Sequence, residues 1–299
     1  MAVNNSLAKR QEGGTLSAYL ANDAVKRKIN EMVGGKDGQR FITSIISAAS
    51  VNPALSQCRH DTILSAAMLG EALKLSPSPQ LGQYYMIPFE NRKENYTAAQ
   101  FVLGYKGYIQ LAIRSGYYKK LNVLAIKEGE LISFDPLNES IEVDLMSDDV
   151  AREESPTIGY YAMFEYQNGF RKALYWSKEK MLCHADKYSK AFSREAYQKI
   201  LDGKIPEKDQ WKYSSFWYKD FDGMAYKTML RQLISKWGIM SIEMQQAIDG
   251  DYAVISEDGT PDYVEDAAPE QEPAIHEDVT DVEYTPAEQT AEAAFFDEK

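Results

Sequence analysis

The sequence has little cysteine and no long apolar run. Its 299 residues include only two cysteines, Cys58 and Cys183, too few for a disulfide framework and typical of a reducing compartment. The longest uncharged run, residues 41–58, is interrupted by polar residues, whereas a bilayer-spanning helix needs about 20 mostly apolar residues. The first ten residues lack the apolar stretch of a signal peptide. We therefore expect a cytoplasmic protein with no membrane segment.

Motifs of the common nucleotide-driven and zinc-dependent enzymes are also missing. No GxxxxGK[ST] phosphate loop occurs, and the nearest string, GGKDG at residues 34–38, has the wrong spacing. ATP-driven chemistry is therefore not expected. Cys58-x-His60 and Cys183-His184 lack the spacing that is usual for zinc ligands. We expect no catalytic residue, no cofactor and no metal.

Negative charge is concentrated at the C-terminus. Residues 251–299 contain 16 Asp or Glu, four prolines and one basic residue, Lys299. The other 250 residues hold 32 Lys or Arg against 29 Asp or Glu, a net charge of +3. Such an acidic segment without apolar periodicity is expected to be disordered. It is either a solubilising tail or a docking or autoinhibitory segment that imitates nucleic-acid phosphates.

The rest of the chain changes from helical to strand patterns and back. Apolar spacing and capping residues predict helices at 15–33 (one, or two with a cap at Asp23), 41–50, 61–75 with Asp61 as cap, and 214–237. Aromatic and β-branched runs predict a hairpin of residues 83–89 and 98–103, and strands at 117–126 and 131–134. A second hairpin, 157–166 with 170–176, encloses Asn168-Gly169, which favours a type I′ turn. The order predicts an α+β fold with a central, largely antiparallel sheet flanked by N- and C-terminal helices.

Two basic, aromatic-rich segments are candidates for phosphate binding. Residues 100–127 contain five basic residues and no acidic one, and helical spacing places Lys106 and Arg114 on one face. Lys106 lies where a strand enters this helix, so the positive helix end adds to its charge. In residues 211–237, Lys227 and Arg231 share a stripe with Gly223. Aromatic residues among cations suit single-stranded nucleic acid, although most of these aromatic side chains are expected in the core and a solvated basic edge is the alternative for the first helix.

Residues 128–154 are acidic, and eleven carboxylates occur by position 165 against Arg152 alone. This pattern leaves open a two-metal nuclease. A solvated acidic surface, or one that docks on a neighbouring subunit, is the alternative.

Five strings in order resemble the RecT family of phage single-strand annealing proteins, and more distantly the Red beta annealing core. They are NPxLxxC from Asn52, LxP from Leu75, LGQxYxIPF from Leu81, GYKGYIxLAxRSG from Gly104 and FxxMAxKTxLR from Phe221. The resemblance runs from about residue 15 to residue 249. It divides the chain into a flexible N-terminus (1–14), an annealing domain that binds DNA and oligomerises (15–249) and the acidic tail (250–299).

The resemblance implies a non-enzymatic, ATP-independent recombinase that anneals complementary DNA strands. Its expected partners are single-stranded DNA, the annealed duplex, other copies in a ring or helical filament, a 5′→3′ exonuclease, and a host single-strand-binding protein. The motifs assign DNA binding to Lys106, Arg114, Lys227 and Arg231, and charge alone adds Lys119, Lys120 and Lys219. A metal-dependent nuclease and a passive protein that protects single strands are the alternatives.

Overall fold

The structure is a computed structural model that describes residues 14–34, 37–91 and 95–263. The chain divides into a unit of residues 1–269 and a unit of residues 270–299. The second unit, and with it most of the expected acidic tail, lies outside the described residues, as does nearly all of the expected flexible N-terminus.

Short helices build the N-terminal part. Thr15 and Asn22 cap the first two helices by accepting hydrogen bonds from Ala18 and Ala24 N–H, so the 15–33 segment is two helices and its second cap lies one residue before Asp23. The elements are α1 (Leu16–Leu20), α2 (Asp23–Val33), α3 (Gly38–Val51), the 3-10 turn η1 (Pro53–Gln57) and α4 (His60–Ala72). Helix α4 begins before Asp61, which lies in its first turn and is not the cap.

The first predicted hairpin belongs to a four-stranded antiparallel sheet in the order β1-β2-β8-β9. Its strands are β1 (Tyr84–Asn91), β2 (Tyr96–Leu103), β8 (Ala253–Ile255) and β9 (Pro261–Asp262). All three residues of β8 are buried, and Phe101 of β2 pairs with Ala253. Residues 250–262 are therefore built into this fold, and the boundary expected at 250 lies inside it.

The second predicted hairpin belongs to a separate sheet in the order β3-β6-β7. It comprises β3 (Tyr118–Lys127), β6 (Thr157–Tyr166) and β7 (Arg171–Ser177). Gly169 has φ +85° whereas Asn168 keeps a negative φ. The connection is therefore a three-residue loop with glycine in the left-handed position, and the expected type I′ turn is wrong.

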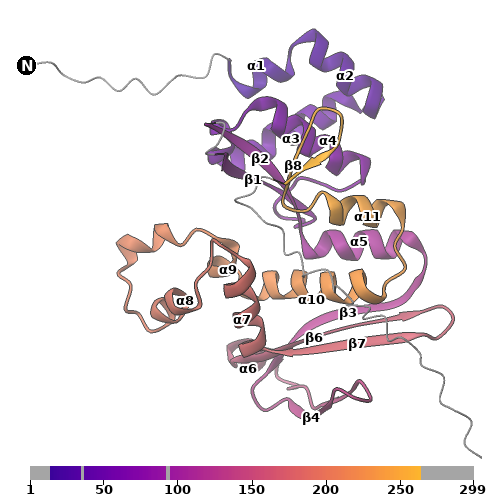
Figure 1. The fold of residues 1–299 in the computed structure, drawn as a ribbon, viewed down its shortest axis with the longest axis vertical. Coiled ribbons are helices and arrows are strands. Elements are labelled where there is room, and N and C mark those ends of the chain that lie inside the picture. Colours follow the sequence, from indigo (N-terminus) through magenta and orange to yellow (C-terminus); the bar gives the residue numbers. More distant parts are fainter. Residues whose placement is uncertain (1–13, 35–36, 92–94, 264–299) are drawn as a thin grey trace, which may run out of the picture. The chain divides into compact units, whose positions relative to one another are not determined.

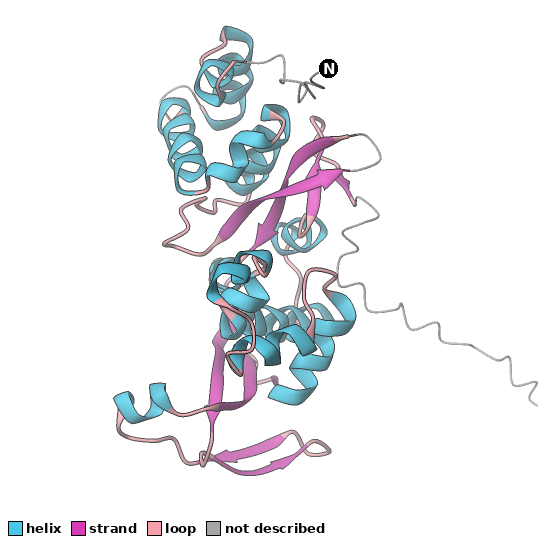
Figure 2. Ribbon diagram, turned by 90° about the vertical axis from the view of Figure 1, so that its left-hand side faces the viewer, coloured by secondary structure: helices cyan, strands magenta, loops and turns pink. Residues whose placement is uncertain are grey.

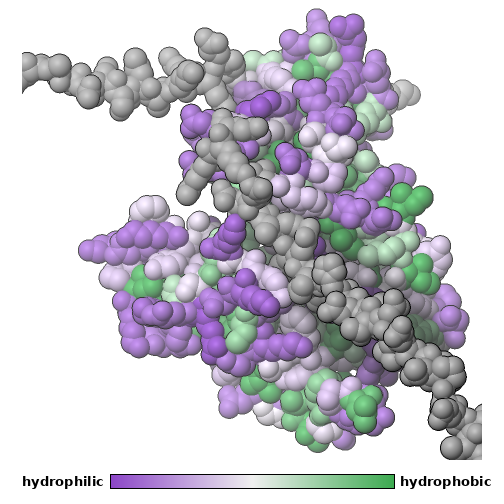
Figure 3. All heavy atoms as spheres, in the orientation of Figure 1, coloured by the Kyte–Doolittle hydropathy of each residue, from purple (hydrophilic) through white to green (hydrophobic). Residues whose placement is uncertain are grey.

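A two-stranded hairpin, β4 (Leu131–Asp135) with β5 (Ser140–Val143), precedes α6 (Asp149–Glu154). The α+β class is confirmed, but the strands form three antiparallel sheets and not one central sheet (Figure 2). Apolar side chains are exposed on this hairpin, including Ile132 at 59% and Leu137 at 88%. Green, apolar surface accordingly gathers at the lower edge of Figure 3, where Figure 1 places β4.

The remaining helices follow β2 and β7. They are α5 (Tyr105–Ser115), α7 (Lys178–Tyr188), α8 (Arg194–Leu201), the 3-10 turn η2 (Glu207–Lys212), α9 (Phe216–Lys219), α10 (Phe221–Trp237) and α11 (Ile242–Asp249). The helix expected over 214–237 is broken at Asp220, whose carboxylate accepts the N–H of Gly223 and so begins α10. Among the described residues, no helix is long and apolar enough to cross a bilayer.

Helix α10 is shared by two hydrophobic cores. Leu230 and Ile234 join a core made by the N-terminal helices, the β1-β2-β8 strands and α5. Met229 and Leu233 join another made by the β3-β6-β7 sheet, α7 and α9. Figure 1 accordingly shows α10 between α5 and the strands β3, β6 and β7. Burial on two sides explains why apolar residues occupy both faces of this helix.

Candidate nucleic-acid interface

The two basic segments singled out in the sequence meet in the structure. Helix α5 packs against α10, and the Tyr105 and Tyr226 rings contact edge to face with centroids 5.6 Å apart. The cations on the two helices nevertheless have different environments.

Lys106 lies in the first turn of α5 and is exposed. It has no carboxylate partner among the described residues, and Gly104 at the helix start makes no side-chain cap. A Cβ on Gly104 or Gly107 would lie 2.2 Å from the carbonyl oxygen of Gly82 or Gln83, so both positions require glycine for the preceding loop to pack here. An ammonium beside the positive end of a helix is a favourable position for a phosphate.

Tyr85 of β1 lies next to Lys106 and contacts in turn Phe216 of α9. A Cβ added to Gly82 would be 3.1 Å from Tyr85 Oη and 3.4 Å from Lys106 Cδ, which shows that these side chains converge. The Tyr85 and Phe216 rings are 5.3 Å apart, and Phe216 is 38% exposed. Burial, followed by the charge of Asp220, raises the pKa of Tyr85, so its hydroxyl stays neutral.

Lys219 lies three residues after Phe216 on the same short helix α9. It is exposed and has no carboxylate partner within residues 14–34, 37–91 and 95–263. We call Tyr85, Lys106, Phe216 and Lys219 the Tyr85 cluster. It combines two cations with an accessible ring, the combination that single strands require.

Arg114, at the other end of α5, is bound to a neighbouring helix. Its guanidinium donates hydrogen bonds to the carbonyl oxygens of Leu73 (2.5 Å) and Lys74 (3.2 Å), which follow α4 directly. A cation at this position stabilises the helix C-terminus. Arg114 is also exposed, so its outer edge is open to solvent.

Lys119 and Lys120 share one carboxylate across the β3-β6 pair. Their ammonium groups lie 2.5 and 3.5 Å from Glu165 oxygens, and a β-bulge between Tyr118 and Lys120 brings the adjacent lysines to the same acceptor. The hydrogen bond from Lys119 lowers the pKa of Glu165. Both lysine side chains are at least half exposed. Exposed pairs contribute only about 0–1 kcal/mol, so a phosphate can compete for these cations.

Lys227 and Arg231 are engaged inside the protein. Their nitrogens lie 2.8 and 2.9 Å from the two oxygens of Asp251, which has no exposed surface and also accepts the Leu103 N–H. Lys227 is 5% exposed, and its ammonium lies 3.9 Å from the centre of the Tyr252 ring. These cations hold residues 250–253 against α10 and β2. A DNA contact by Lys227 would require the Asp251 contact to open.

The one fully buried carboxylate of the acidic 128–154 region, that of Glu130, stabilises the local structure. Glu130 binds the Arg152 guanidinium at 2.5 Å and accepts the N–H groups of Lys127 and Met146. Burial alone would raise the pKa of Glu130, but these bonds outweigh it and the pKa is lowered. No group of three His, Cys, Asp or Glu in the described part of the chain could hold a metal ion.

Asp251 is the important residue that the sequence analysis missed. It follows α11 in the C-terminal segment, whose acidic composition predicts disorder. The one available signal was that Ala253–Ile255 is an apolar run within that segment.

The comparisons with known proteins agree on one family. The model of the RecT family matches residues 39–271. The chain is 36% identical over 272 residues to the uncharacterized protein YqaK of Bacillus subtilis, covering 88% of this chain and 82% of YqaK. It is 27% identical over 201 residues to Protein RecT of Escherichia coli, covering 67% of this chain and 65% of that protein.

Proposed function

The chain belongs to the RecT family, and we propose that it binds single-stranded DNA and anneals complementary strands without ATP. Membership of this family implies a single-strand annealing recombinase, and such annealing proteins are generally not enzymes. The family match over residues 39–271 is the observation that carries this proposal, because it includes both basic segments.

Annealing needs no fuel, since each stacked step of duplex releases about 1.4 kcal/mol. The obstacles are repulsion between the strands and the search for register. A protein removes them by neutralising phosphates while leaving the base edges free to pair. Exposed lysines without an intramolecular carboxylate suit that task, and within the described residues Lys106 and Lys219 of the Tyr85 cluster meet this description. Lys119, Lys120 and the outer edge of Arg114 extend the proposed contact surface.

Register over many bases requires several copies on one strand. We propose that copies assemble head to tail in a ring or filament, since a repeating heterologous interface produces either. The exposed apolar side chains of the β4-β5 hairpin, Ile132 and Leu137, are candidates for that interface. The strand would be supplied by a 5′→3′ exonuclease acting on duplex ends, and a host single-strand-binding protein would be a further partner.

The test uses Lys106→Gln with Lys199→Gln as control, because Lys199 is an exposed lysine that pairs within its own helix with Glu195. We expect Lys106→Gln to weaken binding to every oligonucleotide sequence alike and to lower the salt slope by about 0.7. Lys199→Gln should leave both unchanged. A sequence-dependent loss would mean that Lys106 reads bases and does not hold the backbone.

The rival functions differ in what they do to labelled DNA. A nuclease would fragment it in the presence of Mg²⁺, and a carboxylate substitution in residues 128–154 would abolish the fragmentation. A passive binding protein would leave the rate of annealing unchanged or lower it. The proposed function requires intact strands and faster annealing.

A further inference from the structure

Three aromatic side chains gather along helix α7, which belongs to neither of the basic segments that the sequence indicated. Trp176, at the end of β7, contacts His184 with ring centroids 5.2 Å apart, and His184 contacts Tyr188 one turn later at 4.7 Å. All three side chains are partly exposed. Together with Lys180 and Lys187 we call them the α7 stripe.

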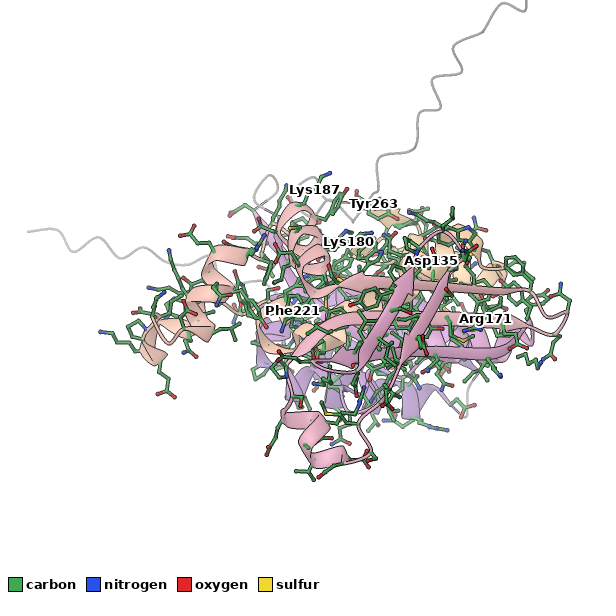
Figure 4. The ribbon with its side chains drawn as sticks, turned by 90° about the horizontal axis from the view of Figure 1, so that it is seen from below. Asp135, Arg171, Lys180, Lys187, Phe221 and Tyr263 are labelled. Atoms are coloured by element: carbon green, nitrogen blue, oxygen red, sulfur yellow. The ribbon has the colours of Figure 1, made fainter. Side chains whose placement is uncertain are left out.

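The two lysines of the α7 stripe lie over its rings. Lys180 Nζ is 4.3 Å from the centre of the Trp176 ring, and Lys187 Nζ is 4.9 Å from that of Tyr188. Both lysines are exposed, and Figure 4 labels them on α7. Lys187 has no carboxylate partner among the residues that the structure describes. The stripe thus presents positive charge directly on aromatic faces.

The carboxylates of α7 are held by a neighbouring residue. The Arg194 guanidinium lies 2.5 Å from a Glu179 oxygen, and the Arg194 backbone N–H donates to Asp186 at 2.8 Å. Arg194 therefore draws both acidic groups toward the start of α8. This arrangement leaves the charge of the stripe positive, which favours an anionic ligand.

The strengths of the two kinds of contact determine which ligand fits. A cation over an exposed ring raises the equilibrium constant for that contact roughly 2- to 5-fold, whereas a base stacked on a ring raises it roughly 5- to 150-fold. A base can therefore replace an ammonium on the ring. The displaced lysine has a long flexible stem and can follow the phosphate of the same nucleotide.

We propose that the α7 stripe binds unpaired bases of single-stranded DNA by stacking, with Lys180 and Lys187 moving from the rings to the phosphates. This proposal rests on the proposed function and adds to it a second contact surface, on α7, whose recognition is through base faces. An acidic peptide is the other ligand with suitable charge, but it carries an aromatic ring only at occasional residues, whereas every nucleotide of a single strand has a planar base.

The experiment compares a 30-nucleotide oligo(dT) with an abasic strand of equal length and charge, using the full chain. The variants are Tyr188→Leu and Lys187→Gln. Phe170→Leu is the control, because Phe170 is 47% exposed and lies outside both the stripe and the two basic segments. Circular dichroism establishes that each variant is folded.

We expect the wild type to bind oligo(dT) more tightly than the abasic strand. Tyr188→Leu should lower oligo(dT) affinity about 5-fold or more and leave abasic binding unchanged. Lys187→Gln should lower the salt slope by about 0.7 with both strands, and Phe170→Leu should change neither the affinity nor the salt slope.

Equal loss on both strands, or no loss, in Tyr188→Leu would overturn the stacking proposal while leaving the proposed function intact. A peptide of residues 264–299 that binds the wild type, and loses binding in Tyr188→Leu while oligo(dT) binding stays unchanged, would also overturn it. No binding of either strand by the wild type would instead refute the proposed function and, with it, this proposal.

Discussion

Replacing Asp251 by Asn tests whether its buried ion pairs with Lys227 and Arg231 stabilise the fold. Asp251 is fully buried and is the shared partner of Lys227 and Arg231 at 2.8 and 2.9 Å. Asparagine has nearly the same shape and can still accept the Leu103 N–H. The substitution therefore removes the negative charge that lies 2.8 Å from the ammonium of Lys227, whose side chain is 6% exposed.

The magnitude follows from this burial. Removing one partner of a buried ion pair costs about 3–5 kcal/mol, because the remaining charge is uncompensated. Arg231 is the less deeply buried cation, at 13% exposure, and can turn toward solvent, so we expect about 3 kcal/mol. At about 2–4 °C per kcal/mol, Tm should fall by about 6–12 °C.

Urea denaturation and thermal scans followed by circular dichroism measure the change in the free energy of unfolding. Lys227→Met in the Asp251→Asn background should restore part of the stability, with a coupling energy of about 1–3 kcal/mol. A loss of unfolding free energy below about 1 kcal/mol in Asp251→Asn would refute the reasoning. Additive effects of Asp251→Asn and Lys227→Met would also refute it, because they would show that the two side chains do not interact. If folded Asp251→Asn also bound DNA much more tightly, Lys227 and Arg231 would be DNA ligands that Asp251 restrains.

Two further predictions concern stability. The lowered pKa of Glu130 means that its stabilising contribution is present above its ordinary pKa of about 4.5 and is lost as the pH falls through the lower, folded-state pKa. Unfolding free energy should therefore fall more steeply below pH 4.5 in the wild type than in Glu130→Gln; parallel pH profiles would contradict this. Gly70→Ala would place a Cβ 2.3 Å from the buried Tyr84 ring, and overpacking costs about 1–3 kcal/mol against a helix-propensity gain of about 0.5–1 kcal/mol. The Tm of Gly70→Ala should therefore be lower than that of the wild type. A higher Tm would show that the Tyr84 ring can move to make room for the added methyl group.

Local patterns were sufficient for most elements of the fold. Alternating aromatic and β-branched residues located β1, β2 and the β6-β7 hairpin, because a strand with one buried face imposes that pattern on its own residues. The turn type was missed because Asn-Gly fits both a two-residue type I′ turn and a three-residue loop. Only the pairing of Glu165 with Arg171 shows that the loop has three residues. The number of sheets could not be read from strands alone, since it depends on long-range packing.

The site was harder to predict, because exposure depends on distant residues. The stripe of Lys227 and Arg231 was read as open to solvent, yet residues that follow α11 cover it. Ile234, an apolar residue on the same side, was the sequence signal that this face of α10 is buried. For Lys106 the local pattern was sufficient, since helical spacing places it on the side of α5 opposite the buried Tyr108 and Ala112.

The central claim is that this chain accelerates the pairing of complementary strands without fuel. The most direct measurement mixes two complementary oligonucleotides, labelled with a fluorophore and a quencher, with and without the protein and with no nucleotide or metal ion. We expect the protein to raise the rate of quenching, and Lys106→Gln to raise it less. An unchanged or lower rate, at concentrations where wild-type protein coats both strands, would contradict the account.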